Sequence, residues 1–88
     1  MSTPAEIAFI TEALVRALVE ADAMVRAGSF GRELLEVLRH AREVAEILRE
    51  AVDAAGDDVD KQTHEMAATL AAAVESLDYQ IEKHGSVH

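Results

Sequence analysis

Two glycine-containing breaks, AGSFG at residues 27–31 and AAGDDVD at residues 54–60, divide the chain into three segments of similar length. Each segment has about 24 to 27 residues, enough for a helix of roughly 36 to 40 Å. Breaks this short force neighbouring helices to run antiparallel. The sequence therefore predicts an all-α fold: a single up-down-up domain of three antiparallel helices at about 4–27, 30–55 and 58–84.

Helix-end signals support these boundaries. Thr3, Pro4 and Glu6 form a capping box with proline at the first helical position, which predicts the start of the first helix. At each break, a glycine that can adopt the left-handed conformation is followed by a residue that can cap the next helix. These two predicted pairs are Gly28–Ser29 and Gly56–Asp57.

The apolar residues recur at helical spacing and cover unusually wide arcs. In the second helix the main seam is Leu34, Leu38, Ala41, Ala45, Leu48, Val52 and Ala55. A second stripe runs beside this seam, and the first and third helices also carry flanking apolar residues, whereas a monomeric bundle needs only one stripe per helix. Extra apolar surface is typical of an interface, although alanine can make such arcs look more apolar than they are. We predict a homo-oligomer, most simply a two-fold dimer, with interface residues Val15, Val19, Val37, Val44, Ile47, Ala51, Ala68 and Ala72.

His40 is the candidate for chemistry, because Glu36 precedes it by four residues and Glu43 follows it by three. On a helix both carboxylates can approach the imidazole, so the three residues could hold a divalent metal. However, no histidine in the chain has a glutamate three residues before it, as helical di-metal sites require. We therefore expect a histidine at the edge of the apolar stripe and no metal site or cofactor.

The other histidine patterns are weaker. THEMAA at residues 63–68 begins like a zinc-protease helix, but Ala68 occupies the position of the second histidine. His84 and His88 have the spacing of a two-histidine clip, but Gly85 interrupts them and we expect a disordered tail.

The composition excludes several classes of partner and chemistry. The net charge is −9, which disfavours binding to nucleic acids and to anionic membrane surfaces. The chain has no cysteine, so it can form no disulfide. There is no apolar run of about 20 residues and no signal-peptide pattern, so we expect a soluble, cytoplasmic or recombinant protein.

The matched helices, capping residues, minimal loops, seam patterning and lack of cysteine and tryptophan resemble idealised, designed helical bundles. The resemblance covers the whole chain and rests on no motif. Arginine outnumbers lysine, which occurs only at positions 61 and 83, and a small protein from a GC-rich bacterium would share many of these features.

These observations favour a structural, self-assembling or protein-interaction bundle without catalytic activity. The alternative is a bundle that binds a small molecule or metal, with His40, together with Glu36 and Glu43, or Tyr79 as its polar group. Its pocket would lie among facing alanines, namely Ala17, Ala41, Ala45, Ala67 and Ala71. A third reading is a binder of another protein through an exposed helical stripe.

Overall fold

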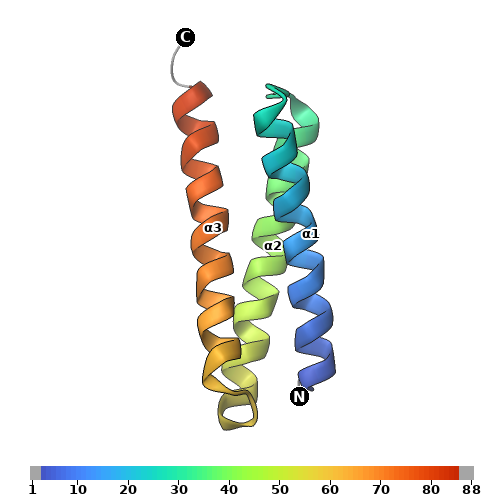
Figure 1. Ribbon diagram of the computed structural model, residues 1–88, viewed down its shortest axis with the longest axis vertical. Coiled ribbons are helices and arrows are strands. Elements are labelled where there is room, and N and C mark those ends of the chain that lie inside the picture. Colours follow the sequence, from blue (N-terminus) through green and yellow to red (C-terminus); the bar gives the residue numbers. More distant parts are fainter. Residues whose placement is uncertain (1–2, 86–88) are drawn as a thin grey trace.

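The structure is a computed structural model and describes residues 3–85, without the side chain of His84. Within this range the chain forms helices α1 (Pro4–Arg26), α2 (Arg32–Ala55) and α3 (Lys61–Gly85), with a short 3₁₀ turn, η1 (Gly56–Asp58) (Figure 1). α2 packs against both other helices, while α1 and α3 meet over a smaller surface. The predicted all-α, up-down-up three-helix bundle is confirmed. The predicted tail residue His88 lies outside the described residues.

The start of α1 has the predicted capping box. Thr3 Oγ1 accepts a hydrogen bond from the backbone N–H of Glu6 at 3.2 Å, and Glu6 Oε2 accepts one from Thr3 N–H at 3.4 Å. Pro4 occupies the first helical position, where its missing N–H leaves no helical hydrogen bond unmade.

The first break differs from the prediction in one respect. Gly28 has a φ of +77° and ends α1 as predicted. Ser29, however, does not cap α2, because the residue at the N-cap position is Gly31. The Ser29 N–H donates to the Met24 carbonyl at 2.9 Å and so completes the end of α1. α2 begins later, at Arg32, behind Gly31, which provides no side-chain cap. The predicted start at residue 30 was therefore wrong.

The second break is longer than predicted. Gly56 takes a positive φ of +55° and opens η1, which contains Asp57, so Asp57 is not the cap of α3. That role falls to Asp60, whose Oδ1 accepts a hydrogen bond from Thr63 N–H at 2.8 Å. Val59, expected in the third helix, instead lies in the connection and is buried.

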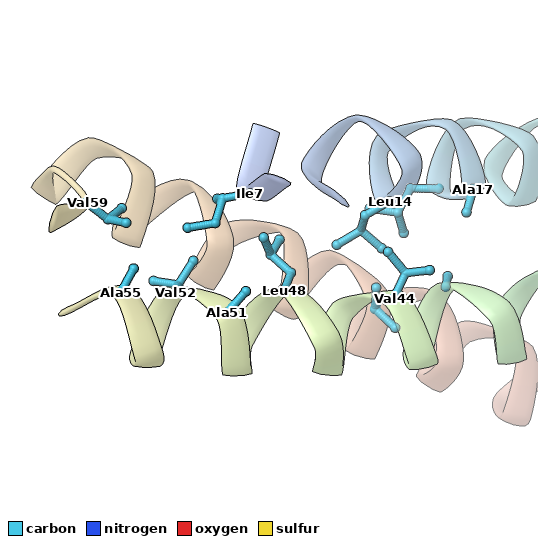
Figure 2. Close-up of a cluster of buried hydrophobic side chains, with 12 residues drawn as sticks. Ile7, Leu14, Ala17, Val44, Leu48, Ala51, Val52, Ala55 and Val59 are labelled. Carbon is cyan, nitrogen blue, oxygen red and sulfur yellow. The ribbon is translucent and has the colours of Figure 1, made fainter. Parts of the chain in front are cut away.

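The buried core lies mainly between α1 and α2. Figure 2 shows it as a row of aliphatic side chains, with Val59 at the end of the row near η1. Of the residues in α3 whose burial is described, only Val74 is fully buried. The main buried cluster consists of Ile7, Leu14, Ala17, Leu18, Ala41, Val44, Leu48, Ala51, Val52, Ala55, Val59 and Val74, and Ala21, Leu34 and Leu38 are also buried.

Two further features concern polarity. The buried hydroxyl of Thr11 donates to the Ile7 carbonyl at 2.8 Å, so this polar group is satisfied within α1. Among the described residues, no helix combines the length and apolar content that crossing a membrane would require.

Candidate interaction surface

The structure places His40 on the rim of an open groove of about 550 Å³ between the second half of α1 and the first half of α2. Arg16, Glu20 and Glu36 also line it, and Val37 and Ala17 form part of its floor. The side chain of His40 is exposed. The groove is therefore a solvated surface depression with mixed charges.

The three residues that could have held a metal are not gathered around one point. Glu36 shares the groove with His40, whereas Glu43 pairs with Arg39 at 3.7 Å. Among the described residues, no group of three or more histidine, aspartate or glutamate side chains is placed to hold a metal ion. The spacing of these residues along the helix brings their side chains near one another, but the side chains do not converge on a common point.

The facing alanines do not enclose a pocket. Ala41 is fully buried and Ala17 is 5% exposed, so both are part of the packed core. Ala45 and Ala71 line an open groove between α2 and α3, beside an ion pair between Arg42 and Asp78. This cross-helix pair was not anticipated from the sequence.

Neither Ala67 nor Tyr79 completes the predicted pocket. Ala67 and Ala71 line a small groove with Arg49 and His64. Tyr79 is 65% exposed, so its ring faces mainly solvent. The predicted enclosed site with Tyr79 as its polar group therefore does not form within the single chain.

The residues of the predicted interface divide into two groups. Val44 and Ala51 are buried in the core of the single chain, so assigning them to an intermolecular surface was wrong. Both face inward because α2 lies between two neighbours and buries a wider arc than either outer helix. The remaining members are exposed or half-buried: Val15, Val19, Val37, Ile47, Ala68 and Ala72.

Those exposed residues do not share one face. Val37 lines the α1–α2 groove, whereas Ala68 lies beside α2 on α3. A separate groove of about 280 Å³ lies between the first halves of α1 and α3, where Ala8 and Thr11 face Met66. Val15 and Val19 continue the row from Thr11 at four-residue steps, so they lie along the same side of α1.

His64 joins the second break to α3, a role that could not be predicted from the sequence. Its Nε2 lies 3.1 Å from the Gly56 carbonyl oxygen, and since a carbonyl only accepts, this nitrogen carries the hydrogen. Four residues earlier, hydrogen bonds from the Thr63 side chain and backbone lower the pKa of Asp60, and the nearby His64 adds a smaller effect in the same direction. The turn is thus held by polar contacts on both sides.

Replacing Asp60 with alanine should lower the free energy of unfolding at neutral pH, because Thr63 N–H loses its partner and the start of α3 loses a favourable charge. The pKa of Asp60 is lowered in the folded state. Its contribution is therefore complete above the ordinary carboxyl pKa of about 4 and is lost as the pH falls through the folded value. Urea unfolding of both proteins from pH 7 downward should show the difference shrinking in acid.

Asp60→Asn is the matched control, since asparagine keeps an oxygen that can cap the helix but carries no charge. Its loss at neutral pH should be smaller than that of Asp60→Ala. A deficit in Asp60→Ala that stays constant from neutral pH to acid would contradict the role of the ionised carboxylate.

Comparison with known proteins adds no relative: no protein family, no curated protein and no solved structure matches this chain.

Proposed function

We propose that this chain is a helical interaction module without catalytic activity, whose function is to associate with a second copy of itself. The observation that supports this is the amount of apolar side chain left in contact with solvent on a single chain. Such residues occur on all three helices and in the first break. They are Phe9, Val15, Val19, Phe30, Leu35, Ile47, Met66 and Tyr79.

The seam of α3 adds to this argument. Leu70, Ala73 and Leu77 pack against the core but are only half-buried, as is Ile81 one turn further on. In a bundle with a fully buried core, neighbouring helices cover such a seam on both sides. Association would remove this remaining apolar area from water, at about 25 cal/mol per Å² before the costs of association.

The groove that contains His40 supports a second candidate function, the binding of a small molecule. Its volume of about 550 Å³ is large enough for a small ligand. Binding there would have to rely on Arg16, His40 and Glu36, all of which are exposed, so water competes for each contact. Self-association is the better-supported proposal because it would be stabilised by the burial of exposed apolar surface. Ligand binding would instead depend on charged side chains that water already solvates.

The proposal predicts a solution mass of at least twice 9.5 kDa in sedimentation equilibrium at tens of micromolar chain. Because each copy carries a net charge of −9, added salt should screen the repulsion and strengthen association. A mass of 9.5 kDa at both low and high salt would overturn the proposal.

A further inference from the structure

We infer that the α1–α3 face is the surface on which a second copy docks, and that the same face of each copy forms the contact. We define this face as the groove lined by Ala8, Thr11 and Met66 together with its continuation along Val15 and Val19. The inference rests on the proposed self-association and specifies where it takes place.

The first argument is that this side of the bundle is the least covered. α1 and α3 share a smaller contact surface than either shares with α2. In Figure 1, α3 also stands apart from the α1–α2 pair towards the end of the bundle where α3 finishes. Along the face, Val15 is 41% exposed, Val19 63% and Met66 44%. The half-buried Leu70 and Leu77 lie four and eleven residues beyond Met66, so they continue its row on α3.

The area of one long side of the bundle also fits a dimer interface. The bundle measures 47 by 17 by 17 Å, so one long side covers roughly 800 Å². That is the area that each partner contributes to a stable protein–protein interface of ordinary size. A two-fold pair needs one such face per copy, because the same patch is used twice.

The third argument is charge, and it selects a second copy as the occupant. The flank of α3 next to Met66 carries uncharged polar residues at helical spacing: Gln62, Thr69, Ser76 and Gln80. On α1 the nearby acids are already neutralised in ion pairs, Glu12 with Arg16 and Asp22 with Arg26, each at 2.9 Å. The two aspartates that line the groove, Asp58 and Asp60, lie together at its end near the second break, so a basic partner would find few free carboxylates along the rest of the face. Two copies that each carry −9 can approach most closely along Thr11, Val15 and Val19, where the neighbouring acids are paired with arginines.

The test is a pair of double variants compared by sedimentation equilibrium. Val15→Glu/Val19→Glu places two carboxylates from each copy in the proposed contact and should weaken association by about 100-fold or more. Leu35→Glu/Ile47→Glu makes the same change on α2, which does not form this face, at residues of similar exposure, 58% and 52%, and should leave the mass unchanged. Far-UV circular dichroism checks that each variant is folded, and Met66→Glu tests the same face from α3 if the α1 variant unfolds.

The possible outcomes separate the two proposals. A dimer that survives both Val15→Glu/Val19→Glu and Met66→Glu overturns the α1–α3 assignment and leaves self-association standing. A dimer lost only in Leu35→Glu/Ile47→Glu likewise moves the interface elsewhere. A parent chain that is monomeric at every salt concentration removes the proposed function itself, and this inference with it.

Discussion

Replacing Leu48 with alanine should lower the free energy of unfolding by about 2–5 kcal/mol. Leu48 is 1% exposed and lies within the row of core side chains in Figure 2. Truncation removes its buried carbons from the core and leaves a space that neighbouring helices can close only in part. The residues beside it in that cluster include Val44 and Val52, which are anchored on the same helix and cannot both move to fill the gap.

The expected loss is large compared with the total free energy of unfolding. A domain of 88 residues has a stability of about 4–13 kcal/mol at the usual 0.05–0.15 kcal/mol per residue. Leu48→Ala should therefore shift the urea midpoint strongly, or leave a visible unfolded fraction without urea. The measurement is urea unfolding followed by circular dichroism at a fixed chain concentration, because association would make the midpoint depend on concentration.

Leu35→Ala is the matched control, with the same chemical change on the same helix. Leu35 is 58% exposed, so its truncation leaves no cavity in the single chain and should alter stability by no more than about 0.5 kcal/mol. Equal losses in the two variants would mean that the packing around Leu48 differs from the structure described here.

The number, direction and main seams of the helices could be predicted because they depend on local signals. The leucine seam of α2, the Thr3 capping box and the left-handed Gly28 each follow from a few neighbouring residues, and the structure confirms all three. The cap positions at the breaks were missed for a different reason. Whether Ser29 serves the helix before it or the one after it depends on how far the chain must travel to reverse direction, and periodicity holds no such information.

The burial of Val44 and Ala51, which belong to the second apolar stripe of α2, was also missed. Val44 and Ala51 resemble Ile47 in sequence spacing, but they are buried while Ile47 is 52% exposed. The difference depends on α2 being the helix that contacts both others, which is a property of the assembled bundle. In the same way, the contact of His64 with the Gly56 carbonyl requires the path of the second break, and the incomplete burial of α3 requires the spacing between helices.

Replacing Ala41 with leucine should lower the free energy of unfolding by about 1–3 kcal/mol. Ala41 has no exposed surface and belongs to the same buried cluster as Leu14 and Ala17. Three additional carbons can enter that site only by pushing α2 away from its neighbours or by forcing side chains out of favoured rotamers. The two residue types have similar helix propensities, so the change in stability reports on packing.

This variant also separates a packed core from the enclosed pocket that the alanine pattern suggested. If a void lay beside Ala41, leucine would fill it and raise the urea midpoint, whereas the close packing described here predicts a lower midpoint. Ala72→Leu is the control, because Ala72 is exposed on α3 and should tolerate the larger side chain within about 0.5 kcal/mol. A stabilised Ala41→Leu beside an unchanged Ala72→Leu would restore the pocket, and with it the case for a bound apolar ligand, because the alanines would then line a space rather than bring two helices together.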